Sequence, residues 1–201
     1  MNLDLTLDHS YWSQRYAAGR TEWDVGAITP PLRDYFVQLG PADQRRILIP
    51  GAGNSYEAEY LHTLGFGQVF VADVVPEPLQ ALQARAPSFP AEHLLLQDFF
   101  TLPNLPPYDL IVEQTFFCAL PPMQRPAYAA KCAQLLRRGG TLMGVLFDAD
   151  FGPRQEPPFG GSRTEYHSYF APYFDFVHFD AAYNSVKPRQ GRELFICLKK
   201  K

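Results

Sequence analysis

The sequence predicts an α/β fold: a seven-stranded, mostly parallel sheet with an antiparallel pair of strands at its C-terminal end and helices on both faces. Short apolar runs alternate with helical stretches from residue 46 onward, as they do where crossover helices join parallel strands. The first run leads directly into Gly-Ala-Gly at 51–53, a strand-to-helix turn typical of nucleotide-binding sheets. A short segment with Pro188 and Gly191 joins the last two runs, which favours an antiparallel pair.

Each strand is predicted from a short apolar run bounded by turn-forming residues. We expect parallel strands at residues 47–50, 69–72, 93–96, 110–112 and 141–147, and the antiparallel pair near residues 174–179 and 194–198.

The helices between these strands are predicted from their end signals. Asn54 and Glu57 resemble a capping box that opens the first crossover helix. The second helix begins at Pro76, because proline is tolerated in the first helical turn. The third opens at Pro126 and is predicted to end at the glycine pair 139–140.

Composition excludes several classes of protein. A length of 201 residues suits one domain with a sizeable core, and 46% hydrophobic residues with 19% charged residues is a globular balance. A net charge of −3 without an extended basic run argues against a nucleic-acid partner. No apolar stretch approaches the roughly 20 residues of a membrane span. Three widely spaced cysteines and no secretory signal pattern predict a cytoplasmic location. The scattered histidines predict no metal site.

The strand, glycine turn and helix at residues 47–64 predict a cofactor site at the carboxyl edge of the sheet. Gly51 and Gly53 would let the backbone approach a ligand that a Cβ atom would meet. Asp73 ends the next strand, about 20 residues after the turn, where dinucleotide folds place a ribose-binding carboxylate. Tyr56 occupies the position of the fingerprint's third small residue and disfavours NAD. An NAD-dependent oxidoreductase remains an alternative.

Two further acids follow predicted strands. Asp98 is a candidate acceptor for an adenine amino group, and Glu113 is a candidate partner for a cationic end of the cofactor. Solvated acids at strand ends are common, so each has an ordinary structural explanation as well.

The chain resembles the thiopurine S-methyltransferase superfamily and is most similar to its thiol/halide methyltransferase branch. The resemblance runs from about Trp12 to Lys199. Its motifs are Trp12 with Tyr16, Thr-Glu-Trp-Asp-Val-Gly at 21–26, Ile-Pro-Gly-Ala-Gly at 49–53, Thr-Phe-Phe-Cys-Ala at 115–119, Pro-Pro-Phe at 157–159 and Pro-Arg-Gln-Gly-Arg-Glu at 188–193.

The resemblance implies a Rossmann-like class I methyltransferase that binds S-adenosyl-L-methionine. It implies one domain, 1–201, in which segment 1–40 covers the cofactor and 41–201 is the Rossmann-like core. Aromatic faces attract a sulfonium. The implied cofactor-binding residues are Trp12, Tyr16, Trp23, Gly51, Gly53, Asp73, Asp98, Phe99 and Glu113.

Four positions depart from the family pattern. Ala52 replaces a cysteine, Tyr16 a tryptophan and Glu113 an aspartate. Glu156 stands where the family's Gly-Pro-Pro-aromatic motif has glycine, so the substrate wall is expected to differ.

The implied reaction is an in-line methyl transfer to a small soft nucleophile, namely a thiol or hydrosulfide, a halide or a thiopurine. We expect Phe116, Phe117 and Phe159 to bind this acceptor. Arg125 is a candidate catalytic residue that positions an anionic acceptor or lowers a thiol pKa, with a surface arginine as the equal alternative. A non-catalytic S-adenosylmethionine-binding protein also remains open. No obligate protein partner is indicated.

Overall fold

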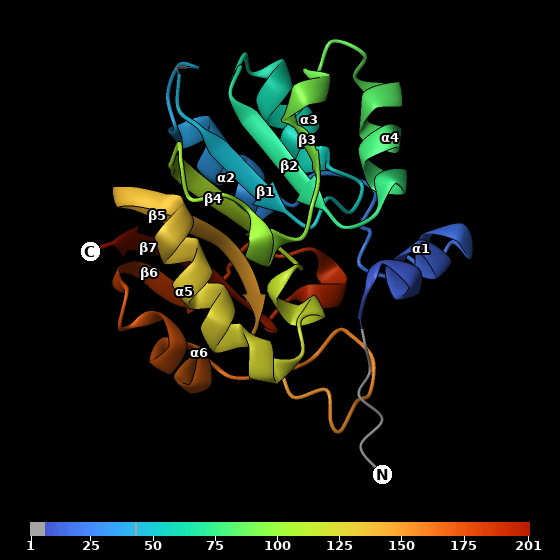
Figure 1. Cartoon of the computed structure of the whole chain (residues 1–201). Coiled ribbons are helices and arrows are strands. Elements are labelled where there is room, and N and C mark those ends of the chain that lie inside the picture. Colours follow the sequence, from blue (N-terminus) through green and yellow to red (C-terminus); the bar gives the residue numbers. More distant parts are fainter. Residues whose placement is uncertain (1–6, 43) are drawn as a thin grey trace.

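The computed structural model describes residues 7–42 and 44–201 and contains one sheet of seven strands in the order β3-β2-β1-β4-β5-β7-β6 (Figure 1). Neighbouring strands from β3 through β5 are parallel, and β7 pairs antiparallel with both β5 and β6. The predicted fold class is confirmed. The first six residues of the predicted covering segment 1–40 lie outside the described residues.

The strand order reverses at β1, which lies between β2 on one side and β4 on the other. Ligands of open α/β sheets bind at such a reversal, outside the carboxyl ends of the strands. The strands are β1 Ile47–Pro50, β2 Val69–Asp73, β3 Leu94–Leu96, β4 Tyr108–Gln114, β5 Leu136–Phe147, β6 Phe174–Ala181 and β7 Glu193–Lys200.

Helices cover both faces of the sheet. The helices on the faces are α2 Pro30–Gln38, α3 Tyr56–Thr63, α4 Pro76–Arg85, α5 Arg125–Leu135 and α6 Arg163–Phe170. Helix α1, His9–Ala17, lies beside α4 instead (Figure 1). Neither α1 nor α2 was predicted, because helix end signals were identified only in the chain after the glycine turn. Asp8 caps α1 by accepting the N–H of Tyr11 at 3.0 Å, as short polar residues do at helix starts. No helix in the described part of the chain is both long and apolar enough to cross a membrane.

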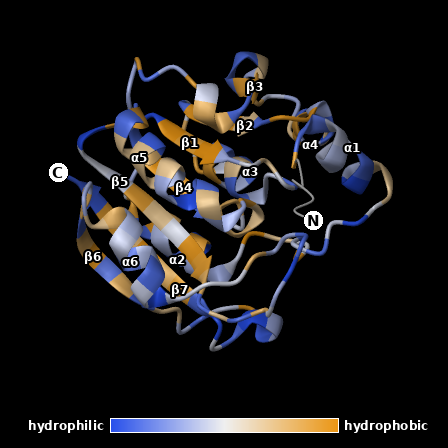
Figure 2. Cartoon of the chain, turned by 60° about the horizontal axis from the view of Figure 1, so that its bottom comes forward, coloured by the Kyte–Doolittle hydropathy of each residue, from blue (hydrophilic) through white to orange (hydrophobic). Residues whose placement is uncertain are grey.

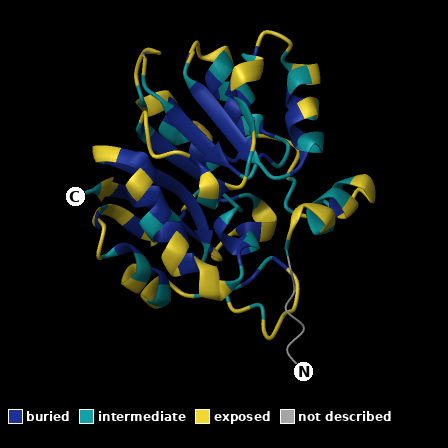
Figure 3. Cartoon of the chain, in the orientation of Figure 1, coloured by how far each residue is buried: buried dark blue, intermediate teal, exposed yellow. Residues whose placement is uncertain are grey.

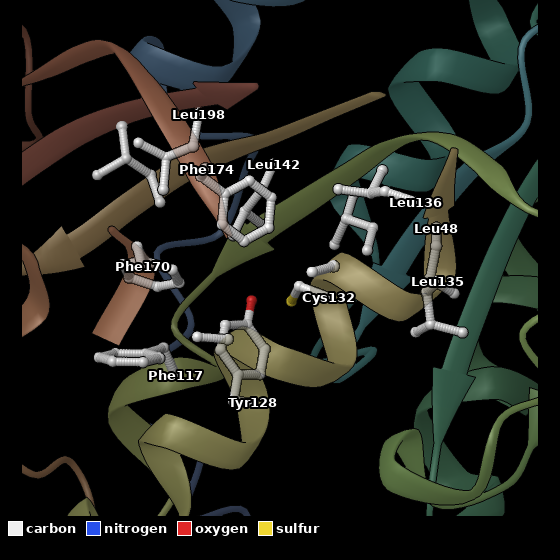
Figure 4. Close-up of a cluster of buried hydrophobic side chains, with 14 of the residues drawn as sticks. Leu48, Phe117, Tyr128, Cys132, Leu135, Leu136, Leu142, Phe170, Phe174 and Leu198 are labelled. Carbon is white, nitrogen blue, oxygen red and sulfur yellow. The ribbon is translucent and has the colours of Figure 1, made fainter. Parts of the chain in front are cut away.

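The alternation of side chains along the strands creates two cores, one on each face of the sheet. Leu48 of β1 belongs to the core under α5 and α6 (Figure 4), whereas Ile47 and Ile49 belong to the core under α2, α3 and α4. The central strands are largely buried and apolar, whereas the edge strands β3 and β6 are more exposed. Polar exposed residues lie on the outer sides of the helices (Figures 2 and 3).

Three local predictions are corrected by the structure. The predicted capping box is wrong: Ser55 is the N-cap of α3 and has a φ of 56°, while the Asn54 amide donates to Asp24 instead. Helix α5 ends before the glycine pair 139–140, because β5 begins at Leu136, which pairs with Tyr108 of β4. The glycine pair therefore lies inside a strand.

The third correction concerns β3 and β4. Strand β3 begins one residue later than predicted, because His93 closes a short 3-10 turn. Strand β4 is longer than predicted and includes Glu113. Glu113 is therefore a strand residue rather than the first residue of the following loop.

Candidate active site

A cavity of about 540 Å³ lies at the carboxyl ends of β1, β2 and β4, where the strand order reverses. Its size is in the range that holds a small-molecule cofactor. The N-terminal segment, the glycine turn, the ends of β2 and β4, and the loop before α6 all contribute to its walls. The predicted residues that line it are Trp12, Tyr16, Trp23, Gly51, Gly53, Asp73, Asp98, Phe99 and Phe116.

The glycine turn after β1 has both glycines in the left-handed region, with φ of 70° at Gly51 and 53° at Gly53. A Cβ atom on Gly51 would lie 2.5 Å from Cδ2 of Phe116, and one on Gly53 would lie 3.6 Å from Nε1 of Trp23. The first separation is a collision and the second an ordinary contact. Two features therefore favour glycine at position 51: the left-handed backbone conformation and the close packing of the Phe116 ring.

Asp73, the last residue of β2, closes this turn. Its Oδ2 atom accepts the N–H of Ala52 at 2.8 Å, and its Oδ1 atom accepts the N–H of Val75 at 3.1 Å. Burial raises the pKa of Asp73 to about 6, against the effect of these hydrogen bonds. A carboxylate can accept about four hydrogen bonds, so Asp73 keeps acceptor capacity toward the cavity that it lines.

Asp98 and Phe99 follow β3 and form another part of the wall. Asp98 caps a short 3-10 turn by accepting the N–H of Phe100 at 2.8 Å. The Phe99 ring packs edge-to-face on Phe116, with ring centroids 5.5 Å apart. The wall therefore has a carboxylate beside an edge-to-face pair of aromatic rings.

Three aromatic rings from the N-terminal segment cover the cavity. Trp23 lies edge-on to Trp12 at 5.8 Å and to Tyr16 at 5.6 Å between ring centroids. Burial raises the pKa of Tyr16, so its hydroxyl stays protonated at neutral pH. The Arg15 guanidinium lies over Trp23 and forms ion pairs with Glu22 and, at 3.4 Å, with Glu156.

The N-terminal segment is attached to three other parts of the chain. The Trp23 carbonyl accepts a hydrogen bond from Arg189 at 2.7 Å. The Ser13 hydroxyl donates to Glu77 of α4, and the Thr29 hydroxyl donates to Gln114 at the end of β4 at 3.1 Å. These contacts hold the segment over the carboxyl ends of the strands, where the strand order reverses.

Two residues predicted at the site instead belong to the interior. Phe117 is 1% exposed and packs in the core with Tyr128 and Phe170 (Figure 4). Glu113 is fully buried; its Oε1 accepts the N–H of Phe117 at 2.9 Å and its Oε2 accepts the hydroxyl of Tyr128 at 2.6 Å. Burial raises the pKa of Glu113 to about 7. The structure corrects both assignments, because neither residue lines the cavity.

Arg125 and Phe159 also do not line the cavity, although their chain neighbours Gln124 and Pro158 do. Arg125 is fully buried, and its two terminal nitrogens donate to the carbonyls of Phe159 and Gly160, each at 2.9 Å. Phe159 lines a separate hollow in front of α6. The structure therefore corrects the direct acceptor contacts predicted for both residues, and it also corrects the surface-arginine alternative for Arg125.

Several cavity residues were not predicted individually. Arg15 and Arg189 each bring a guanidinium to the wall, and both are 7% exposed. Arg189 is part of the predicted motif at 188–193, and Arg15 lies between the predicted Trp12 and Tyr16, so the sequence held a signal for both. Thr115 has a left-handed φ of 62°, which no sequence pattern here indicated.

The chain is similar to known methyltransferases over nearly its whole length. The family model "Thiopurine S-methyltransferase (TPMT)" matches residues 7–198. "Probable thiol methyltransferase 2" of Arabidopsis thaliana is 30% identical over 188 residues, covering 90% of this chain and 81% of the relative. "Thiocyanate methyltransferase 1" of Brassica oleracea is 29% identical over 197 residues, covering 94% and 84%.

A solved structure shares the fold. The 1,6-didemethyltoxoflavin-N1-methyltransferase of Burkholderia thailandensis, solved with bound 1,6-didemethyltoxoflavin and S-adenosylhomocysteine, superposes with a TM-score of 0.77 at 21% identity. The match covers 96% of this chain and 87% of that one.

Proposed function

Since this chain belongs to the thiopurine S-methyltransferase family and is an S-adenosylmethionine-dependent methyltransferase, we propose that its acceptor is a small soft nucleophile. A thiol or hydrosulfide is the first choice, followed by a halide, with a thiopurine as the remaining candidate. The observation that carries this choice is a mainly apolar cavity whose wall includes the buried guanidinium of Arg189, paired on its other side with Glu193.

The residues around the cavity fit the cofactor's chemistry. Asp73 has acceptor capacity left for the two ribose hydroxyls, and Asp98 with Phe99 offers an acceptor and an aromatic face to adenine. Trp12, Tyr16 and Trp23 offer faces to a sulfonium. When bound, S-adenosylmethionine supplies a methyl group on a positively charged sulfur, which is already activated for displacement.

The chain's own contribution is alignment and exclusion of water. The covering segment closes the cavity, so a nucleophile inside loses solvent and is held against the donor. Such orientation contributes roughly 7–11 kcal/mol to a barrier. A thiolate that arrives ionised needs no proton transfer, and Arg189 stabilises its negative charge. A soft anion enters such a cavity more readily than a strongly hydrated one.

The buried cysteines are consistent with a reducing cytosol. Cys118, Cys132 and Cys197 are free thiols in the structure, which supports the cytoplasmic location predicted from composition.

The test uses the purified chain of residues 1–201. Calorimetry should show S-adenosylmethionine and S-adenosylhomocysteine binding at micromolar levels, about −8 kcal/mol, and more tightly than NAD. Turnover is then measured with a panel of thiols, hydrosulfide, halides, thiopurines, alcohols and amines. Methylation of alcohols or amines alone would contradict the acceptor class. Cofactor binding without any turnover would favour the non-catalytic alternative.

A further inference from the structure

Two loops that are distant in sequence form a joined part of the cavity wall. The loop after β4 lines the cavity with Thr115, Phe116 and Cys118, and the loop before α6 lines it with the residues at 157–158. The N–H of Phe159 donates to the carbonyl of Cys118 at 2.7 Å. A displacement of one loop is therefore transmitted to the other.

Each loop is also held by one fully buried ionisable side chain. The Glu113 carboxyl accepts the N–H of Phe117 in the first loop. The Arg125 guanidinium donates to the carbonyls of Phe159 and Gly160 in the second loop. Burying such groups is costly unless they are well hydrogen-bonded, and here their bonds are made chiefly to loop backbone and to Tyr128.

Helix α5 is the common support for both attachments. Arg125 stands at its first position, and Tyr128, which bonds Glu113 at 2.6 Å, stands three residues later. Residues three apart share one face of a helix. Tyr128 itself is fully buried in the core under α5 (Figure 4), so this face is fixed in position by packing.

The loop after β4 contains a conformation that needs such support. Thr115 adopts a left-handed φ of 62°, which is unfavourable for a β-branched residue and persists only where the surroundings enforce it. The bond from Glu113 to the Phe117 N–H spans this residue. Its effect extends to Phe116, whose ring lies against Gly51 of the glycine turn.

We propose that Glu113 and Arg125 are positioning residues that fix the two joined loops to α5 and so set the geometry of the acceptor. This inference rests on the proposed function, because it assumes that an acceptor occupies the space beside these loops. It assigns the two residues an indirect role in place of the direct contacts predicted for them.

The test compares variants that break each attachment with variants that spare it. Glu113→Ala and Arg125→Met should raise the acceptor KM or lower kcat by about 10- to 100-fold, the cost of a misplaced reacting group. S-adenosylhomocysteine affinity should fall much less than kcat/KM does, because the broken attachments belong to the loops and not to the glycine turn. Glu113→Gln keeps an acceptor oxygen for the Phe117 N–H and should restore most of the activity. Glu165→Gln is the matched control, because Glu165 pairs with Arg125 at 3.4 Å but bonds neither loop.

Amide exchange over residues 115–119 and at Phe159 and Gly160 gives a second readout that does not depend on the acceptor. It should accelerate in Glu113→Ala and Arg125→Met and stay slow in Glu165→Gln. If the first two variants do not fold, Tyr128→Phe carries the test, since it deletes a single hydrogen bond to Glu113 and should accelerate exchange over 115–119.

The two proposals fail in different ways. Unchanged exchange in these loops overturns the inference, as does a loss of cofactor affinity equal to the loss of kcat/KM. A wild-type enzyme that binds the cofactor yet methylates none of the soft nucleophiles overturns the acceptor proposal, and the exchange readout still decides the inference.

Discussion

The ring of Phe116 occupies the space that a side chain on Gly51 would need: its Cδ2 atom lies 2.5 Å from the position of a Cβ atom there. The glycine turn after β1 and the loop after β4 can therefore pack this closely only because residue 51 has no side chain. This contact joins the cofactor side of the cavity to the side that we assign to the acceptor.

We predict that Gly51→Ala impairs the enzyme much more than Gly53→Ala. Both glycines have left-handed backbones, so both variants pay about 1–2 kcal/mol of conformational strain. Only Gly51→Ala adds a collision, because the nearest atom to a Cβ on Gly53 is 3.6 Å away. Overpacking of this kind adds typically 1–3 kcal/mol. Thermal unfolding measures the loss of stability in each variant, and calorimetry with S-adenosylhomocysteine measures the loss of cofactor affinity.

A compensating change tests the cause of this difference. Gly51→Ala combined with Phe116→Ala should recover much of the lost stability, because the colliding ring is gone. Equal effects of Gly51→Ala and Gly53→Ala would show that backbone strain alone accounts for the glycine.

We predict that cofactor affinity rises with pH through about 6 because of Asp73. Burial raises the pKa of Asp73 to about 6, and the ionised carboxylate is the better acceptor for ribose hydroxyls. Asp73→Asn should weaken binding by about 1.5–3 kcal/mol and remove this pH dependence. Calorimetry from about two pH units below to two units above this pKa measures both effects. If the cofactor affinity of Asp73→Asn depended on pH as the wild-type affinity does, Asp73 would not be the group that titrates.

The same carboxyl has the opposite effect on folding of the cofactor-free chain. Its pKa is raised above the unfolded value, so the native state binds the proton more tightly. The contribution of Asp73 to the free energy of unfolding is fully present below about pH 4 and is lost as the pH rises through about 6. Asp73→Asn should lack this change in stability over that window.

We predict that the covering segment is ordered further by the cofactor. Amide exchange over residues 9–28 should slow when S-adenosylhomocysteine binds, and the fluorescence of Trp12 and Trp23 should change. Glu156→Gln removes the ion pair that links Arg15 to the loop before α6, and it should speed exchange in this segment modestly. Glu59→Gln removes an ion pair with Arg85 outside the segment and serves as the control. Exchange that is equally slow without ligand would identify the segment as fixed structure.

The features that could be predicted from the sequence depend on local pattern. The alternation of strands and helices along the chain predicts the glycine turn and the position of Asp73. Trp12 and Trp23 were predicted only from the family resemblance, because no local pattern indicates their role. Glu113 was misplaced because the end of β4 depends on pairing with β5. Nothing in a linear sequence distinguishes an acid that closes a strand from one that is buried inside it.

The errors at Arg125 and Phe159 have a similar origin. Arg125 begins α5, and its guanidinium turns inward to bond carbonyls 34 and 35 residues later in the chain. Such long-range contacts are fixed by tertiary packing. The guanidinium groups that do line the cavity belong to Arg15 and Arg189, which come from opposite ends of the sequence.

The final prediction is that Arg189 sets the pH dependence of methylation. Its side chain lines the cavity and is fixed by hydrogen bonds to the Trp23 carbonyl and Glu193. Its charge acts on Cys118, another cavity residue: burial and Glu113 raise the pKa of that thiol to about 12, and Arg189 opposes the rise. An acceptor thiol in the same cavity would feel the same favourable charge.

Because the thiolate is the nucleophile, the rate should rise with pH through the acceptor's pKa. Arg189→Gln should move this profile up by about one pH unit, and Arg189→Lys should move it less because it keeps the charge. The measurement is kcat/KM for one thiol across pH 6 to 10, a window around the usual thiol pKa of about 8.5. Identical profiles for wild type and Arg189→Gln would contradict the role of Arg189, because removal of a charge that acts on the thiolate must change the pH at which it forms.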